Sequence, residues 1–239
     1  GRPEECPRRS SLGLSRDGAA AGRMVVPWQS LLPVPDSLPD TTAVLAESAA
    51  IAWRAASVVG RTGPGDKVAV STTRAVGLLA ALMAQSRGAD VVMIGREEDP
   101  RYRCRRQLAE SLGLRTTTSL EPDSIDTWIE ASGSGRLLAT AVDALRPGGR
   151  LVLVALYATG AQHPVSTVPG KELTVLTSYA STRQDSEAAL DFLTTMPGLG
   201  DELVRLYPMA HAVEALRDAA EGRTAEGSAL FKAVLQPNG

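Results

Sequence analysis

A short turn between a predicted strand and a predicted helix carries the residues best placed for chemistry. Residues 67–79 read KVAVSTTRAVGLL, with an apolar strand before the turn and a helix after it. In the loop G-x-G-x-x-G, which binds the pyrophosphate of a dinucleotide, the first glycine makes the turn and the second lets the backbone approach the phosphates. The third glycine packs the helix on the strand. These positions fall here on Thr72, Arg74 and Gly77, so the turn keeps only the packing glycine.

Two interpretations of this altered turn stay open. In the first, Arg74 and the hydroxyls of Thr72 and Thr73 hold a phosphate, helped by the helix N-terminus at Ala75. In the second, these side chains fill the groove and no dinucleotide enters. The replacement of both contact glycines favours the second interpretation.

The end of the next strand holds a second candidate site. A dinucleotide fold binds the adenosine ribose with an Asp or Glu about 20 residues beyond the glycine loop. The chain has Gly95 at that place, followed by Arg96. A small residue followed by arginine suits a 2′-phosphate and so favours NADP over NAD. The alternative is that Arg96 belongs to a solvated charge run with the acidic residues 97–99.

These candidates need a parallel sheet to position them. Strands are predicted at 67–71, 90–94, 114–118, 127–131, 150–156 and 172–177. Helices are predicted between them, at 76–87, 101–112 and 137–145, and after them at 184–194. This alternation predicts an α/β fold with a doubly wound parallel (Rossmann) sheet over residues 57–205. Ser132 then lies at the carboxyl end of a strand, where open α/β sheets bind ligands. No G-x-S-x-G surrounds it, which argues against a hydrolase.

The remaining residues form a smaller, β-rich part. Residues 1–40 are rich in Pro, Gly and Arg, with one predicted short strand at 24–26. A helix at 43–59, capped by residues 40–42, comes next. A last helix at 209–221 and a last strand at 228–235 close the chain.

The amino-acid composition limits the kinds of partner and site that the chain can have. The chain has 239 residues, 44% of them hydrophobic and 22% charged, with a net charge of -2. This balance gives no electrostatic reason to expect nucleic acid or a membrane as a partner. Two cysteines are too few for a disulfide framework or a cysteine-only zinc site. We therefore expect a cytoplasmic protein that acts on a small molecule.

A series of short landmarks resembles one family. In order they are Gly1-Arg2-Pro3 with Cys6, Asp17-Gly18-Ala19, Val25-Val26-Pro27, Leu45-Ala46-Glu47, Gly63-Pro64-Gly65-Asp66, Glu130-Ala131-Ser132-Gly133, Leu145-Arg146-Pro147-Gly148-Gly149, Lys171-Glu172-Leu173-Thr174 and Ser178-Tyr179. Their number, order and spacing resemble the zinc-type sorbitol and threonine dehydrogenase branch of the medium-chain dehydrogenase/reductase superfamily. The resemblance implies that residues 1–56 and 206–239 are what is left of a GroES-like catalytic domain.

The resemblance also implies a function. Such enzymes move hydride between NAD or NADP and a secondary alcohol or ketone, here of the polyol or amino-sugar alcohol class. Glu47 matches an acidic residue beside the catalytic metal; the alternative is a helix residue at a domain junction. Tyr157 lies near where the family holds the nicotinamide ring; the alternative is a buried aromatic residue. Lys171 and Lys232 match basic positions of the family, and we expect both to be surface lysines.

The departures from the family support an alternative. The family's N-terminal segment with most zinc ligands is missing from the sequence, so we expect no zinc in this chain. A noncatalytic or repurposed member that has lost dinucleotide and zinc binding is therefore the alternative. The resemblance further implies a homodimer, with Leu173–Leu176 near the partner's sheet edge.

Overall fold

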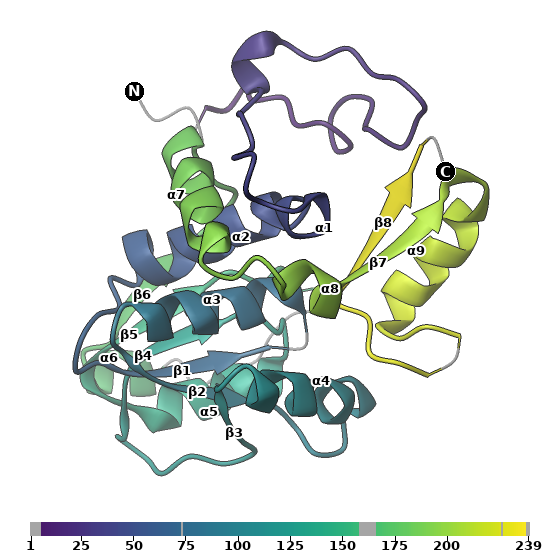
Figure 1. Ribbon diagram of the computed structural model, residues 1–239. Coiled ribbons are helices and arrows are strands. Elements are labelled where there is room, and N and C mark those ends of the chain that lie inside the picture. The colour runs from purple at the N-terminus through teal and green to yellow at the C-terminus, as the bar shows by residue number, and fades with distance from the viewer. Residues whose placement is uncertain (1–5, 73, 158–165, 226, 238–239) are drawn as a thin grey trace. The chain divides into compact units, whose positions relative to one another are not determined.

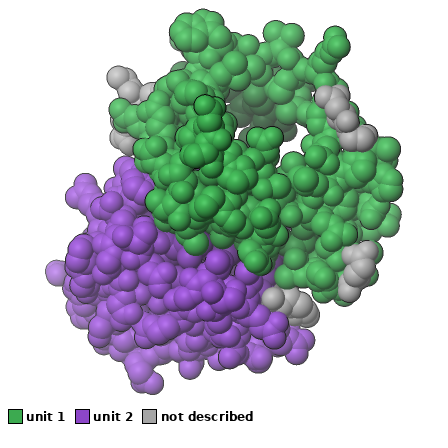
Figure 2. All heavy atoms as spheres, in the orientation of Figure 1, with its two compact units in different colours: residues 1–47, 180–239 green, residues 48–179 purple. Residues whose placement is uncertain are grey.

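The computed structural model describes residues 6–72, 74–157, 166–225 and 227–237, apart from the side chains of residues 100, 101 and 104. The chain divides into two compact units, coloured separately in Figure 2. Unit 2 comprises residues 48–179, and unit 1 comprises residues 1–47 with 180–239. These divisions differ from the domain limits at 56/57 and 205/206 expected from the sequence, which remain a prediction.

Unit 2 is built on a six-stranded sheet in the order β3-β2-β1-β4-β5-β6, in which every neighbouring pair is parallel. The strands are β1 (Lys67–Ser71), β2 (Asp90–Ile94), β3 (Arg115–Thr117), β4 (Ile125–Glu130), β5 (Leu145–Leu153) and β6 (Thr174–Thr177). All six predicted strands are confirmed: β1 and β2 have the predicted bounds, and the other four have shifted ends. The strand order reverses between β1 and β4, which is the doubly wound pattern predicted from the sequence.

Helices cover both faces of this sheet (Figure 1). Helix α3 (Ala75–Ser86) packs on β1, β2 and β4, and α5 (Gly135–Ala144) packs on β4 and β5. Right-handed crossovers on the two sides of the reversal place these helices on opposite faces. Helix α4 (Pro100–Ser111) packs on β3, and the short α6 (Thr167–Gly170) packs on α5. The apolar strands, buried on both faces, form the core that fixes the strand ends.

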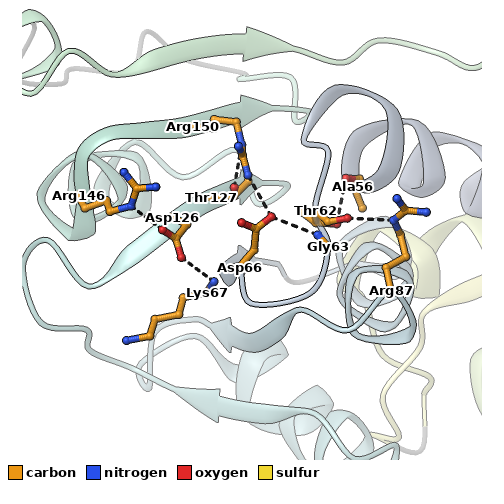
Figure 3. A network of polar contacts seen from close by, with 10 residues as sticks. All are labelled: Ala56, Thr62, Gly63, Asp66, Lys67, Arg87, Asp126, Thr127, Arg146 and Arg150. Atoms are coloured by element: carbon orange, nitrogen blue, oxygen red, sulfur yellow. Dashed lines mark hydrogen bonds and ion pairs between the residues drawn. The ribbon is translucent and has the colours of Figure 1, made fainter.

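A polar network joins the amino ends of β1, β4 and β5 (Figure 3). The carboxylate of Asp66 accepts bonds from Gly63 N and Arg150, each at 3.1 Å. The carboxylate of Asp126 accepts from Lys67 N at 2.8 Å and from Arg146 at 2.5 Å. These contacts lie at the edge opposite to the candidate site, so they stabilise the sheet without entering the site.

Lys171 departs from the prediction of a surface lysine. Its Nζ donates to the carbonyls of Val142, Asp143 and Leu145 at 2.7–3.0 Å and pairs with Asp123 at 2.8 Å. These carbonyls lie at the C-terminal end of α5, where the last four have no partner within the helix. Lys171 is therefore a structural cap for α5.

The predicted helix at 43–59 is divided. Helix α1 (Asp40–Ala43) ends before α2 (Ala46–Trp53), and a π-helix (Arg54–Val59) follows α2 directly. Asp40 lies inside α1 and Pro39 is its N-cap, so the predicted cap is wrong. The Gly60 amide donates to Ala55 O at 2.9 Å, the wider bond spacing of a π-helix.

In unit 1, β7 (Val204–Pro208) pairs in parallel with β8 (Lys232–Gln236), and α9 (Ala212–Glu221) packs on both. Helices α7 (Arg183–Thr194) and α8 (Leu199–Leu203) pack against α1. Short 3-10 turns lie at Trp28–Ser30 and Met209–His211. The predicted strand at 24–26 is wrong: no strand forms there, and Val25 is 93% exposed. Among the described residues, no helix is long and apolar enough to cross a membrane.

Candidate functional site

The candidate site lies along the carboxyl edge of the sheet in unit 2, where the ends of β1, β2, β4 and β5 meet. In open α/β sheets a ligand-binding crevice lies at the carboxyl edge where the strand order reverses, and in this sheet the order reverses between β1 and β4. Eight predicted site residues fall in unit 2, namely Thr72, Arg74, Ala75, Gly77, Gly95, Arg96, Ser132 and Tyr157. Glu47 lies in unit 1.

The turn after β1 is closed by Thr72. Its hydroxyl donates to Arg74 O at 2.8 Å and accepts from Arg74 N at 3.0 Å. The side chain is only 3% exposed and lies against Gly77, where an added Cβ would overlap it. Thr72 therefore packs beneath the helix instead of standing in the crevice. Thr73 lies outside the described residues.

Arg74 and Ala75 form the start of α3. Arg74 is the N-cap residue, with extended backbone and an exposed side chain. Its guanidinium has no partner among the described residues. The Ala75 side chain is buried, so this residue can offer a ligand only its backbone amide. The first-turn amides of a helix have no partner within the helix and favour an anion.

The end of β2 has no room for a ribose-binding acid. A Cβ on Gly95 would overlap the ring of Tyr102, which is 2% exposed. Tyr102 is fixed there because its hydroxyl donates to Thr117 O at 2.7 Å. Burial raises the pKa of its phenol. An aspartate or glutamate at position 95 would have to displace this ring.

Arg96 is half-buried, and its acidic neighbours pair elsewhere. Glu97 pairs with Arg106 at 3.7 Å, and Glu98 pairs with Arg136 at 3.0 Å. Within the part of the chain that the structure describes, Arg96 has no ion-pair partner. Because Glu97 and Glu98 pair with other arginines, these pairings argue against the interpretation of Arg96 as part of a charge run whose members neutralise one another.

The carboxylate of Glu130, the last residue of β4, accepts hydrogen bonds from residues at the carboxyl ends of three strands. Its Oε1 accepts from the Ser71 hydroxyl at 3.0 Å, from Ser132 N at 3.0 Å and from the Ser132 hydroxyl. Its Oε2 accepts from Gly133 N at 3.2 Å and from the Tyr157 hydroxyl at 2.6 Å. In the sequence, Glu130 stands out only as part of the landmark Glu130-Ala131-Ser132-Gly133. Its position at the end of an apolar strand was the one signal for a buried carboxylate.

Tyr157 is thereby tied to the site through its hydroxyl. Its half-buried ring packs against the hydrophobic core beneath α5. Burial raises the pKa of this phenol, and the hydrogen bond to Glu130 and the charge of Glu130 raise it further. The structure thus brings Ser132 and Tyr157 together on one carboxylate.

No group of three or more His, Cys, Asp or Glu among the described residues could hold a metal ion. Glu47 lies in the first turn of α2, with an exposed side chain 3.7 Å from Lys232 Nζ. Cys6 is exposed. The role of Glu47 beside a metal remains a prediction.

Comparison with known proteins identifies the family. The sequence pattern of the family described as "Zinc-binding dehydrogenase" matches residues 75–195, which is half of the chain. The chain belongs to the zinc-binding dehydrogenase family. This confirms the zinc-type branch of the medium-chain dehydrogenase/reductase superfamily indicated by the sequence landmarks.

Curated relatives of this zinc-binding dehydrogenase family member are longer than it is. The sorbitol dehydrogenase of Halalkalibacterium halodurans is 27% identical over 202 residues, which cover 79% of this chain and 58% of that protein. The L-threonine 3-dehydrogenase of Xanthomonas campestris pv. campestris is 26% identical over 191 residues, covering 75% of this chain and 54% of that protein. The chain spans just over half the length of these relatives.

Solved structures share the fold of this family member. An alcohol dehydrogenase from E. coli CFT073, complexed with NADH, has a TM-score of 0.81 at 20% identity, covering 98% of this chain and 70% of that one. A protein from Sinorhizobium meliloti 1021 described as a zinc-binding dehydrogenase, bound to NADP, has a TM-score of 0.81 at 21% identity, covering 97% of this chain and 70% of that one.

Proposed function

We propose that the protein is an oxidoreductase that uses NADP(H) and moves hydride between it and a secondary alcohol or ketone. Membership of the zinc-binding dehydrogenase family supports the reaction class. The sorbitol dehydrogenase among its relatives supports a polyol as the substrate, and an amino-sugar alcohol is the other substrate class that we propose. When bound, the nicotinamide supplies or accepts the hydride, and the protein binds and orients it.

The end of β2 carries the preference for NADP. An acidic anchor for the ribose 2′-hydroxyl is excluded because the Tyr102 ring occupies the place of a side chain at Gly95. Arg96, which follows, keeps a guanidinium that no described acidic residue neutralises. Arginine suits a phosphate because its guanidinium can donate two parallel bonds. We therefore propose that Arg96 binds the 2′-phosphate.

The turn after β1 would meet the pyrophosphate in an altered way. The Arg74 amide is occupied by Thr72, so the phosphates would rely on the α3 amides from Ala75 onward and on the Arg74 side chain. Because Thr72 is buried against Gly77, the turn does not fill the crevice at this position. We therefore propose that the site binds a dinucleotide with fewer backbone contacts than a glycine loop gives.

The same turn favours the alternative function. A threonine that closes the turn on itself removes one amide from the pyrophosphate site. A noncatalytic or repurposed member, which keeps the scaffold without binding a dinucleotide, would need no such amide. Binding measurements separate the two functions directly.

The test is a titration with NADPH and with NADH, followed by nicotinamide fluorescence. We expect NADPH to bind more tightly than NADH. Arg96→Ala should weaken NADPH binding by about tenfold to a hundredfold, the loss of one charged hydrogen-bonding contact. Arg103→Ala is the matched control, because Arg103 is an exposed arginine on α4. If neither nucleotide binds at millimolar concentration, the dehydrogenase function is wrong and the alternative stands.

A homodimer through the sheet edge is part of the proposal. Strand β6 is one of the two edge strands of the six-stranded sheet, and its Val175 is 46% exposed. An outer strand offers unpaired backbone groups to a second copy. A monomeric mass in solution would overturn this part. A cytoplasmic location also remains a prediction.

A further inference from the structure

Glu130 is a buried carboxylate that the proposed function does not use. Its side chain is 0% exposed, and among the described residues its partners are three hydroxyls and two backbone amides, with no cationic side chain. Burying a carboxylate is costly unless hydrogen bonds satisfy it. The five hydrogen bonds satisfy the Glu130 carboxylate, and the same bonds hold each donor group in place.

The donors come from separate elements. Ser71 ends β1, Ser132 and Gly133 follow β4, and Tyr157 follows β5. Ser71 is itself held by the Trp128 indole, whose Nε1 donates to its hydroxyl at 3.2 Å. A Cβ on Gly133 would lie 3.0 Å from Leu156 O, so the segments after β4 and β5 also approach closely. Glu130 is the shared acceptor at this junction.

The junction belongs to one half of the crevice. A doubly wound sheet consists of two mononucleotide-binding halves, and the half containing β1–β3 takes the adenosine. The segments that Glu130 joins after β4 and β5 lie in the other half. At the end of β6 in that half, Ser178 is 3% exposed and its hydroxyl has no partner among the described residues. Buried hydroxyls in proteins normally have a hydrogen-bond partner, and a bound ligand can provide one for Ser178.

We infer that Glu130 is a positioning residue for the nicotinamide half of the dinucleotide. Its carboxylate holds Ser132, Gly133 and Tyr157 in the arrangement that forms this side of the crevice. This inference rests on the proposed function. Four of the five hydrogen bonds to Glu130 come from Ser132, Gly133 and Tyr157, after β4 and β5; Ser71, the donor from β1, is also held by Trp128. The loss of the carboxylate should therefore act mainly on the β4–β6 half, whereas the loss of Arg96 acts on the adenosine half.

The test compares two ligands that differ by the nicotinamide half. NADPH occupies both halves, whereas 2′,5′-ADP carries only the adenosine with its 2′- and 5′-phosphates. We expect Glu130→Gln to weaken NADPH by about tenfold or more and to leave 2′,5′-ADP within about twofold. Arg96→Ala should weaken both ligands. Glu121→Gln, at an exposed position of the same unit, is the matched control.

Milder variants guard against a folding defect in Glu130→Gln. Ser132→Ala and Tyr157→Phe each remove one donor and keep the carboxylate, and both should weaken NADPH selectively.

The outcomes separate the two claims. Selective loss of NADPH in Glu130→Gln supports the positioning role. If Glu130→Gln weakens the binding of both ligands equally, or of neither, the positioning role is wrong and the proposed function is unaffected. If the unsubstituted protein binds neither ligand, the proposed function fails, and the inference falls with it.

Discussion

The side chain of Thr72 occupies the space in which a residue larger than glycine at position 77 would place its Cβ. Thr72 begins the turn after β1, and Gly77 lies in the first turn of α3. The pair explains how the fold keeps close contact between helix and strand after losing the first glycine of the loop. One bulky residue is accommodated because the facing residue has no side chain.

Gly77→Ala should therefore destabilise unit 2. The added methyl overlaps a buried side chain, and overpacking of this kind costs about 1–3 kcal/mol. Urea unfolding measures the change in the free energy of unfolding. Gly170→Ala is the control, since a Cβ there meets no atom within 4 Å. The double variant Thr72→Gly with Gly77→Ala should recover most of the loss; no recovery would mean that Thr72 is not the obstacle.

Thr72→Gly alone should tighten NADPH binding. The change releases the Arg74 amide, which the Thr72 hydroxyl now occupies, and removes the Arg74 carbonyl bond that closes the turn. An amide that points at a phosphate contributes a charged hydrogen bond, so we expect an increase in affinity of about tenfold. Fluorescence titration gives the value. Thr72→Ser keeps the hydroxyl and should leave the affinity unchanged; equal gains in both variants would contradict this explanation.

The sequence predicted the parts of the fold that depend on local pattern. Strand β2 has the predicted bounds, 90–94, because a run of apolar, mostly β-branched residues suits a strand buried on both faces. Strand β7 was missed, since its pairing with β8 depends on residues distant in sequence. The same limit applies to the site. Glu130 meets Ser71 from 59 residues away and Tyr157 from 27 residues away, and no spacing rule connects them.

The contact between Gly95 and Tyr102 could not be predicted either, although these residues lie close together in the sequence. The sequence indicated that position 95 lacks an acid, but not what fills its place. The answer depends on which face of α4 meets the end of β2, and this is set by the packing of the helix. A helix predicted within two residues still leaves that rotation open, because each residue turns it by about 100°.

Lys171→Met should destabilise unit 2 by removing the cap of α5. The ammonium serves three carbonyls and Asp123, and leaving these acceptors without a donor costs about 1–3 kcal/mol. Lys67→Met is the control, because the Lys67 side chain has no bond among the described residues while the stem length is the same. Thermal or urea unfolding of the two variants gives the comparison. Equal stability of both would show that Lys171 is an ordinary surface lysine.

Asp126 should contribute a stability that disappears in acid. Burial pushes the pKa of its carboxyl up, but bonds from Arg146 and Lys67 N and the charges of Arg146 and Arg150 outweigh burial, so the pKa lies below 3.8. A lowered pKa means that the contribution is complete above the unfolded value and declines as pH falls through the folded value. The stability difference between the protein and Asp126→Asn should thus shrink as the pH is lowered below about 4. A difference independent of pH would contradict this.

Tyr207 in unit 1 should give the opposite pH dependence. Burial, the hydrogen bond to Asp218 at 2.7 Å and the charge of that carboxylate raise the pKa of Tyr207 from 10.0 to about 12. Because the folded pKa is raised, the tyrosine stabilises the fold fully below pH 10.0, and the contribution is lost as the pH rises toward 12.

Unfolding of the protein and of Tyr207→Phe across this range should therefore show a stability difference that narrows with rising pH. Tyr179→Phe is the matched control, since it removes a tyrosine that is 49% exposed. Asp218→Asn should lower the pKa of Tyr207, because the variant keeps an acceptor but removes the charge, and absorbance titration of the phenol measures this shift. If Tyr207 ionises at the same pH in Asp218→Asn, burial alone sets its pKa and the Tyr207–Asp218 bond has no part in the alkaline loss of stability.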